Sequence, residues 1–162
     1  MHDEKSLLSE LEKLGIKYKY KPHPAVFTSE QANEIMPELE GAHCKNLFVK
    51  DRTNRKWLLT IPDDKKTDLK KAAEIIGSHR LSFCSPAEMM ECLGLTPGSV
   101  TPLAVINDTL NQVALYVDKN VINWDIINCH PMTNTATISI SKKDFEKFIA
   151  RAGHDLNIAE LT

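Results

Sequence analysis

The sequence predicts a single α+β domain over residues 1–162, with a mixed, mostly antiparallel sheet curled into a partly closed barrel and helices packed outside it. Two observations predict this class. Helix-like and strand-like stretches alternate irregularly along the chain, which is typical of a mixed sheet. The length of 162 residues suits one domain, and no internal repeat, low-complexity tract or linker divides it.

Helices are predicted where apolar residues recur every three or four positions between start and stop residues. Thr28 with Gln31, and Ser85 with Glu88, match the capping box that begins a helix. The first two expected helices span residues 3–14 and 28–36. A third follows Asp64 and ends at Gly77, a fourth runs from Ser85 to Gly94, and the last begins at Ser141.

Strands are predicted in short stretches where apolar side chains alternate with polar ones or fill a brief run. The turn-forming residues 51–54 join two of these stretches as a hairpin. The expected strands cover residues 16–21, 41–51, 57–61, 81–84, 103–106, 113–117, 126–128 and 136–140.

Composition excludes several classes of protein. With 42% hydrophobic and 26% charged residues the chain resembles an ordinary soluble globule, and no apolar run approaches a membrane span. The N-terminus lacks an apolar signal core, so we expect a cytoplasmic protein with no membrane partner. The four cysteines lack paired spacing and are expected to be reduced core thiols.

Two His-Cys pairs suggest a metal site, but their spacing argues against one. The pairs His43-Cys44 and Cys129-His130 carry ligand types, but adjacent strand residues point to opposite faces, and no CxxC or HxxxH spacing occurs. We therefore expect no metal and no cofactor.

Charge is distributed unevenly along the chain. Residues 1–81 hold 15 of the 20 Lys and Arg residues against 13 acidic ones, and residues 50–71 have a local excess of basic side chains. This stretch could contact a phosphate backbone, or it could be an ordinary solvated surface. A pI near 6.3 argues against tight non-specific binding to nucleic acid, so we expect only brief, salt-sensitive contact and no DNA partner.

Lys45 is the residue that most needs an explanation. In a strand it shares one face with Leu47 and Val49, whereas Asn46 and Phe48 share the other. Burying an unpaired ammonium group is costly, so Lys45 either reaches the rim of the sheet or meets an anionic partner at the mouth of a cavity. The alternative is an edge-strand lysine that discourages aggregation.

Three stretches resemble one known family. The segment Cys44-Lys45-Asn46-Leu47-Phe48-Val49-Lys50-Asp51 resembles the KNLF/L-x-x-K/D signature of the YbaK/prolyl-tRNA synthetase-associated family of trans-editing aminoacyl-tRNA deacylases. Residues 98–102 match its GxxxP loop, and His130-Pro131 with the following Thr/Asn run matches the segment that closes its pocket. The similarity covers nearly the whole chain, and the partly closed barrel is also the fold that it implies.

The resemblance implies roles for individual residues. Lys45 would hold the terminal phosphate or ribose of the tRNA 3′ end, Gly98 would let its loop aim amides at the reacting carbonyl, and His130 would line the pocket or orient a water. Substrate-binding residues would be Val26, Phe27, Thr28, Asn46, Ser99, Val100, Thr101, Pro102 and Pro131. Contacts to tRNA would come from Lys50, Arg52, Lys65, Lys66, Lys70 and Lys71.

Two of these roles have a plain alternative. The Gly98 loop could be an ordinary Pro-Gly turn, and His130 could be a structural hydrogen-bonding residue. On an ideal strand Asn46 faces away from Lys45, so either a bulge intervenes or Asn46 acts from behind the site.

The expected function is trans-editing. No nucleophile motif such as GxSxG occurs, but an aminoacyl-tRNA ester is already activated and can be hydrolysed by a positioned water with oxyanion stabilisation. The resemblance implies a deacylase of mischarged tRNA(Pro), first of all alanyl-tRNA(Pro), with prolyl-tRNA synthetase as a transient partner. The alternatives are a cysteinyl-tRNA(Pro) deacylase and a non-catalytic tRNA-binding module.

Overall fold

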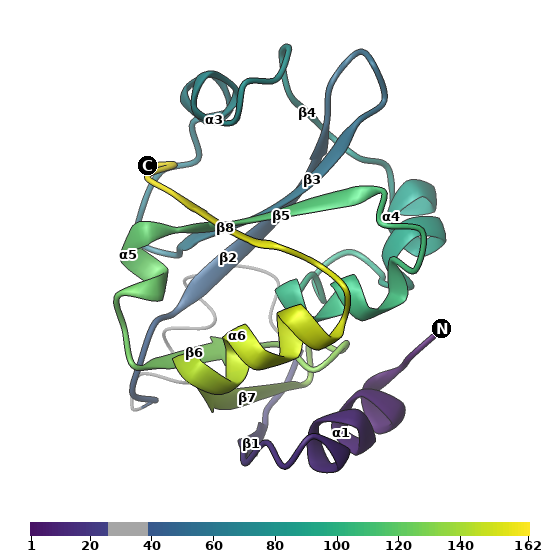
Figure 1. Ribbon diagram of the computed structural model, residues 1–162, viewed down its shortest axis with the longest axis vertical. Helices are drawn as coiled ribbons and strands as arrows, with labels where there is room; N and C mark the ends of the chain where they lie inside the picture. Colours follow the sequence, from purple (N-terminus) through teal and green to yellow (C-terminus); the bar gives the residue numbers. More distant parts are fainter. Residues whose placement is uncertain (26–38) are drawn as a thin grey trace.

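The computed structural model describes residues 1–25 and 39–162 and shows a mixed α+β architecture (Figure 1). In chain order the helices are α1 (Glu4–Lys13), α3 (Leu69–Ile76), α4 (Pro86–Leu93), the 3-10 helix η1 (Pro102–Asn107), α5 (Lys119–Ile122) and α6 (Lys142–Arg151). The strands are β1 (Lys19–Pro22), β2 (Cys44–Lys50), β3 (Lys56–Pro62), β4 (Ser82–Phe83), β5 (Val113–Asp118), β6 (Ile126–Cys129), β7 (Ala136–Ser141) and β8 (Leu156–Ala159).

The strands form two sheets. The larger has five strands in the order β4-β2-β3-β5-β8, and the smaller has three in the order β1-β7-β6. Pairing is antiparallel for β4-β2, β2-β3, β1-β7 and β7-β6, and parallel for β3-β5 and β5-β8. The predicted mixed, mostly antiparallel arrangement is therefore confirmed.

The predicted partly closed barrel is wrong, because the two sheets in the described part of the chain do not close on each other. They meet at a single parallel bridge between Ala42 and Ile127. After this bridge β2 leaves β6 and pairs along its whole length with β3. The close approach requires Gly41, whose φ is 102° and where an added Cβ would lie 2.5 Å from the carbonyl oxygen of Ile126.

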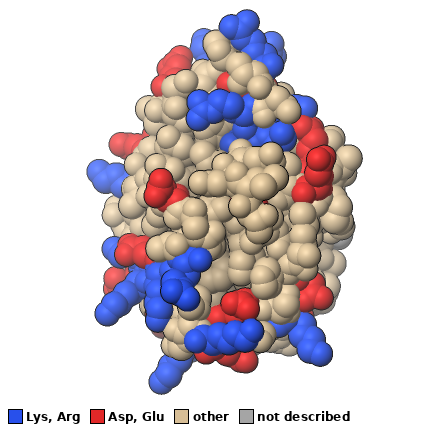
Figure 2. Space-filling model, turned by 45° about the vertical axis from the view of Figure 1, so that its right-hand side comes forward, with Lys and Arg blue, Asp and Glu red and all other residues tan. Residues whose placement is uncertain are grey.

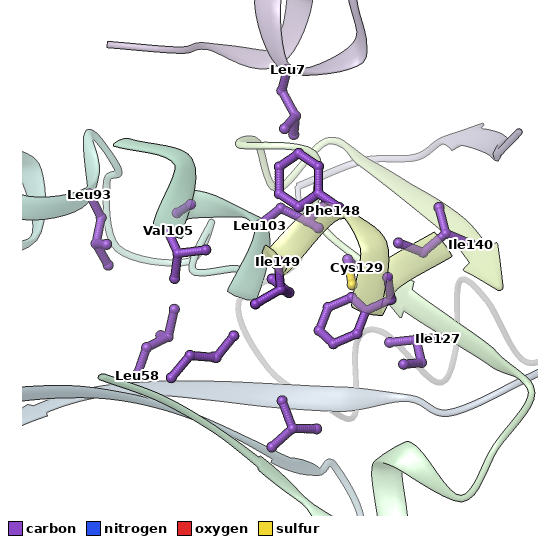
Figure 3. Packing of buried hydrophobic residues seen from close by; sticks show 14 of the residues in the cluster. Leu7, Leu58, Leu93, Leu103, Val105, Ile127, Cys129, Ile140, Phe148 and Ile149 are labelled. Carbon is purple, nitrogen blue, oxygen red and sulfur yellow. The ribbon is translucent and has the colours of Figure 1, made fainter. Parts of the chain in front are cut away.

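The main core lies between the two sheets. One face of the large sheet contributes Phe48, Leu58 and Leu115, and α6 contributes Phe148 and Ile149 (Figure 3). Helix α1 closes the core with Leu7, opposite the strand that carries Leu58 (Figure 3). The apolar stripes predicted for the first and last helices are thus buried as expected.

A second, smaller core covers the other face of the large sheet. Val49, Trp57 and Leu59 pack there against Ala72 and Ala73 of α3. The five-stranded sheet is therefore apolar on both faces, and each polar side chain that it holds requires a hydrogen-bonding partner.

Most predicted elements are present, with one clear error. Residues 103–106 were predicted to form a strand but lie in η1, because the Thr101 side chain caps the segment and Pro102 occupies its first turn. The short helix α5 and the edge strand β8 were not predicted. The predicted helix at 28–36 lies outside the described residues. In the described ranges, none of the helices has the length and apolar character needed to cross a membrane.

Candidate active site

Strand β2 carries Lys45 and Asn46 on opposite faces. The pairing of β2 with β3 is continuous from Cys44–Pro62 to Lys50–Lys56, so no bulge rotates either side chain. Leu47 and Val49, on the Lys45 side, pack in the smaller core, whereas Phe48, on the Asn46 side, is buried in the main core. The alternation predicted for this strand is confirmed, and Asn46 faces away from Lys45, toward the loop before η1.

Lys45 lies at the start of β2, where its side chain is partly exposed. Within residues 1–25 and 39–162 it makes no hydrogen bond or ion pair. Its acidic neighbour is Asp63, whose pKa is raised by partial burial while the charges of His43 and Lys45 counteract that rise. The ammonium group is thus placed to accept an anionic ligand at the rim of the sheet.

Asn46 links the large sheet to the loop before η1. Its Nδ2 donates to the carbonyl oxygen of Val100 at 3.2 Å, and its Oδ1 accepts from the hydroxyl of Thr60 at 2.7 Å. Asn46 and Thr60 lie directly opposite each other in the β2-β3 ladder. Asn46 was predicted as a substrate-binding residue, and its amide is occupied by these two protein partners.

The loop at residues 96–102 begins with a tight turn. The amide of Ser99 donates to the carbonyl of Thr96 at 3.2 Å, with Pro97 at the second position of the turn and Gly98 at the third. Gly98 has a φ of 92°, which a type II turn requires at its third position. A turn alone therefore explains the glycine.

The same turn also presents amides in one short stretch of chain. The amides of Gly98, Val100 and Thr101 have no hydrogen-bond acceptor among the residues that the structure describes, whereas Ser99 is held by its turn. The side chain of Thr101 is fully buried and accepts from the amide of Leu103 at 3.3 Å. Gly98 and Val100 are partly exposed, so their amides are the loop donors that a ligand could use.

His130 directly follows strand β6, and its side chain is partly buried. Burial lowers its pKa, a hydrogen bond to the Ala136 carbonyl counteracts this, and nearby His23 lowers it further. Because a carbonyl oxygen only accepts, the 3.1 Å contact means that His130 Nδ1 carries the proton. In the neutral ring Nε2 is then an acceptor.

His23, which no sequence motif singles out, packs beside His130. The two ring centroids are 6.3 Å apart, and His23 is held by the Pro24 carbonyl at 2.7 Å and by the hydroxyl of Thr137 at 3.0 Å. His23 therefore supports one side of the His130 ring.

Lys45 and His130 both follow the junction between the two sheets. Both lie three residues beyond the bridged pair Ala42 and Ile127, and the chains run parallel at that point. Asn128 reinforces the junction by donating from Nδ2 to the carbonyls of Glu40 at 2.9 Å and Ala42 at 3.1 Å. Two of the predicted catalytic residues thus follow segments that are joined at this junction.

The predicted tRNA-contacting residues do not form one patch. Arg52 lies in the turn between β2 and β3, while Lys65 and Lys66 follow the opposite end of β3, roughly 20 Å away for a strand of this length. Lys70 and Lys71 are exposed on α3. Figure 2 shows Lys and Arg gathered at the upper and lower ends of the molecule, with a broad uncharged face between them.

Among the residues that the structure describes, Lys50 is the one member of this set with an anionic partner. Its Nζ contacts both carboxylate oxygens of Glu88, at 2.9 and 3.0 Å. The hydrogen bonds from Ser85 and Lys50 lower the pKa of Glu88 to about 2. The charge of Lys50 is therefore offset locally.

The remaining predicted residues have simpler outcomes. Pro131 is buried directly after His130, and Val26, Phe27 and Thr28 lie outside the described residues. The four cysteines are free thiols, and burial raises the pKa of Cys129 to about 12. Residues 1–25 and 39–162 contain no group of three or more His, Cys, Asp or Glu side chains arranged to hold a metal.

Sequence reasoning missed the residues that support the site. Thr60, Asn128 and Ser139 act through hydrogen bonds to their neighbours, and Thr60 and Asn128 each interrupt an otherwise apolar strand. That interruption was the available signal, because a polar residue in a buried strand must find a partner.

Comparison with known proteins places the chain in a family. Residues 23–148 match the family model described as the aminoacyl-tRNA editing domain. Over 162 residues the chain is 35% identical to the prolyl-tRNA editing protein ProX of Acetoanaerobium sticklandii, covering 99% of each. It is 36% identical to the prolyl-tRNA synthetase associated domain-containing protein 1 of Bos taurus, covering 93% of this chain and 90% of the bovine one.

The fold agrees with this assignment. A solved structure described as a candidate trans-editing enzyme for prolyl-tRNA synthetase superposes with a TM-score of 0.71 at 20% identity, covering 99% of this chain and 97% of the other. The match to the family model spans most of the chain, and the ProX similarity spans nearly all of it. The chain therefore belongs to the aminoacyl-tRNA editing domain family.

Proposed function

We propose that this chain, an aminoacyl-tRNA deacylase by family, is a free-standing editing enzyme that hydrolyses the ester of mischarged tRNA(Pro), with alanine as the cleaved amino acid. The observation that carries the proposal is its similarity to ProX over almost the full length of both chains. A synthetase pocket shaped for proline cannot strongly exclude the smaller alanine, so a second site that admits alanine and sterically refuses proline restores accuracy.

Lys45 anchors the 3′ end of the tRNA in this proposal. Its partly exposed position at the sheet rim supports this role. Two unit charges about 4 Å apart at an effective dielectric near 20 attract by roughly 4 kcal/mol, which is enough to fix a phosphate at the mouth of the site. Lys65, Lys66, Lys70, Lys71 and Arg52 add weaker, screened attraction for the rest of the acceptor end, and Lys50 contributes when its pairing with Glu88 opens.

The loop at 98–102 receives the reacting carbonyl. A water attacks the ester carbon, and the amides of the loop stabilise the negative charge that develops on the carbonyl oxygen. The departing ribose oxygen takes up a proton as the ester bond breaks. The described amide donors and the fixed turn at Gly98 support this role.

In this proposal His130 lines the aminoacyl pocket together with Pro131. Its Nε2 acceptor, set by the hydrogen bond from Nδ1, can orient the attacking water or accept from the α-ammonium group of the substrate. Its neutral state at pH 7 supports both uses.

A deacylation panel tests the proposal. Alanyl, cysteinyl, seryl and prolyl esters on one tRNA(Pro) are incubated with the purified protein, with buffer alone as the control. We expect alanyl ester to be lost fastest and prolyl ester to be spared. Fastest loss of the cysteinyl ester would reassign the substrate, and binding without loss of any ester would overturn the proposal in favour of a non-catalytic module. Adding prolyl-tRNA synthetase to the same assay tests the transient partnership.

A further inference from the structure

Two polar side chains lie on the apolar main-core face of the five-stranded sheet. Thr60 is 1% exposed in the central strand β3, and Asn46 faces it across the ladder from β2. Their neighbours on this face include Phe48, Leu58 and Val117, which are all buried. Thr60 is buried and Asn46 is partly buried, and polar groups in such surroundings are costly unless their hydrogen bonds are satisfied.

The direction of each hydrogen bond in this pair follows from its partners. The Val100 carbonyl can only accept, so the end of Asn46 that faces it is Nδ2, at 3.2 Å. The end that faces Thr60 is therefore Oδ1, and the hydroxyl of Thr60 donates to it at 2.7 Å. The Val100 carbonyl thus sets which way the Asn46 amide points, and the Thr60 hydroxyl satisfies Oδ1 and holds the side chain in place.

The Asn46 amide is what ties the loop to the sheet. The other hydrogen bonds of residues 96–101 are internal, from Ser99 to Thr96 and from Leu103 to Thr101. In the part of the chain that the structure describes, the contact between Asn46 and Val100 is the hydrogen bond that links this loop to β2. Without the Thr60 donor, Asn46 Oδ1 loses its partner and the side chain is held less firmly in the position from which Nδ2 reaches the Val100 carbonyl.

We propose that Thr60 is a positioning residue for deacylation: its hydroxyl holds the Asn46 side chain in place, and Asn46 in turn holds the Val100 carbonyl and so sets the direction of the loop amides. The inference rests on the proposed function, because it assigns the loop to the reacting carbonyl. Thr60 itself does not touch the substrate. Its effect should appear in the chemical step rather than in tRNA affinity.

The variant Thr60→Val keeps the shape of the side chain and removes the donor, while Thr60→Ser keeps the donor. In single-turnover hydrolysis of alanyl-tRNA(Pro) at saturating enzyme, we expect Thr60→Val to slow the rate roughly 10- to 100-fold and Thr60→Ser to stay within about threefold of the parent. The matched control is Leu59→Val, because Leu59 is the neighbouring buried residue whose side chain faces the smaller core. This control should lose stability and retain the parental rate.

A double-mutant cycle tests whether Thr60 acts through Asn46. In an Asn46→Ala background, Thr60→Val should cause no further loss of rate, since the group that Thr60 holds is already absent. A full additional loss would overturn the inference, and so would a parental rate for Thr60→Val alone.

Amide hydrogen exchange of the free protein separates this inference from the proposed function. Thr60→Val should speed exchange at Ser99, whose amide is the hydrogen-bonded one in the loop, and Leu59→Val should not. If the parent protein hydrolyses none of the esters, the proposed function fails and the inference falls with it. Hydrogen exchange then still reports whether Thr60 and Asn46 hold the loop through Val100. If the parent is active and Thr60→Val changes neither exchange nor rate, the inference alone fails.

Discussion

Each sheet contains an asparagine that faces a hydroxyl residue across an antiparallel pair. In the Asn46 cluster, Thr60 donates to Asn46, which holds the carbonyl of Val100. In the Asn128 cluster, Ser139 donates to Asn128 Oδ1 at 2.5 Å, and Asn128 holds the carbonyls of Glu40 and Ala42. The same arrangement of donors and acceptors is used twice.

The two clusters differ in what the amide holds. Asn46 binds a loop to its own sheet, whereas Asn128 binds the lead-in to β2 and so joins one sheet to the other. We therefore expect the Asn46 cluster to matter most for reaction rate and the Asn128 cluster most for stability. An identical hydrogen-bond motif can serve catalysis or folding, depending on the segment at its far end.

The largest effect should come from Lys45, which belongs to neither cluster. Lys45→Ala should lower deacylation roughly a thousandfold, which corresponds to the loss of about 4 kcal/mol of anchoring. The unfolding midpoint in urea should stay close to that of the parent, because Leu47 and Val49 still pack. Activity within a few-fold of the parent, in a folded variant, would show that Lys45 is not the anchor.

Gly98 sharpens the comparison on the loop side. Gly98→Val should slow the single-turnover step by roughly the 2.7–4 kcal/mol that follows the loss of one oxyanion donor. Valine at positive φ is itself strained, so thermal unfolding must be measured alongside. A folded Gly98→Val protein that hydrolyses at the parental rate would mean that residues 96–99 form only a turn.

The pair Asn46→Ala and Asn128→Ala tests the comparison directly. Asn128→Ala removes one more hydrogen bond than Asn46→Ala, so it should lower the free energy of unfolding by about 1 kcal/mol more. Asn46→Ala should cause the greater loss of single-turnover rate. Urea titration and the deacylation assay on both variants give the two rankings, and the same ranking in both measurements would contradict a division of roles.

His130 adds a pH dependence on the Asn128 side. Its pKa in the native state is below the unfolded value of about 6.5. At a pH between these two pKa values the unfolded state therefore binds more protons than the native state. The free energy of unfolding should therefore fall as the pH drops below about 6.5 and should be independent of His130 above it. Urea titrations from pH 5 to 8 check this, and His130→Asn should have a flatter profile. An unchanged profile would mean that His130 is not the group responsible.

The smallest effect is expected far from both clusters. Changing Lys65, Lys66, Lys70 and Lys71 to Glu should weaken tRNA use chiefly at low salt, where screening is least, and should leave the chemical step unchanged. The KM for aminoacyl-tRNA at two salt concentrations measures this. Parent and variant with the same salt response would remove these residues from the tRNA path.

The sequence predicts the local elements well, because caps, stripes and alternation are properties of neighbouring residues. The capping box at Ser85 and the alternation through Lys45 and Asn46 are both present. Local patterns of this kind do not determine whether the sheets close into a barrel. Whether β2 stays with β6 or leaves it depends on the contact between Gly41 and Ile126, whose positions are 85 residues apart in the sequence.

In the candidate site, too, the residues that could be predicted differ from those that depend on contacts between distant parts of the chain. The resemblance supplied Lys45, Gly98 and His130, and strand alternation already placed Asn46 away from Lys45. Neither could supply Thr60 or Asn128, because their importance lies in contacts to residues that are distant in sequence or on another strand. The prediction of a strand at 103–106 failed for a different, local reason. These β-branched and apolar residues favour a strand, but the cap at Thr101 and Pro102 begins a 3-10 helix instead.

The close approach at Gly41 also limits how this protein can evolve. Any residue other than glycine would place its Cβ 2.5 Å from a backbone oxygen, and a backbone oxygen is present whatever side chain occupies position 126. No second substitution at Ile126 can therefore remove that part of the clash. A lineage that lost Gly41 would have to move a whole chain segment, and with it the positions of Lys45 and His130, so the spacing of the two sheets cannot drift by single compensated steps.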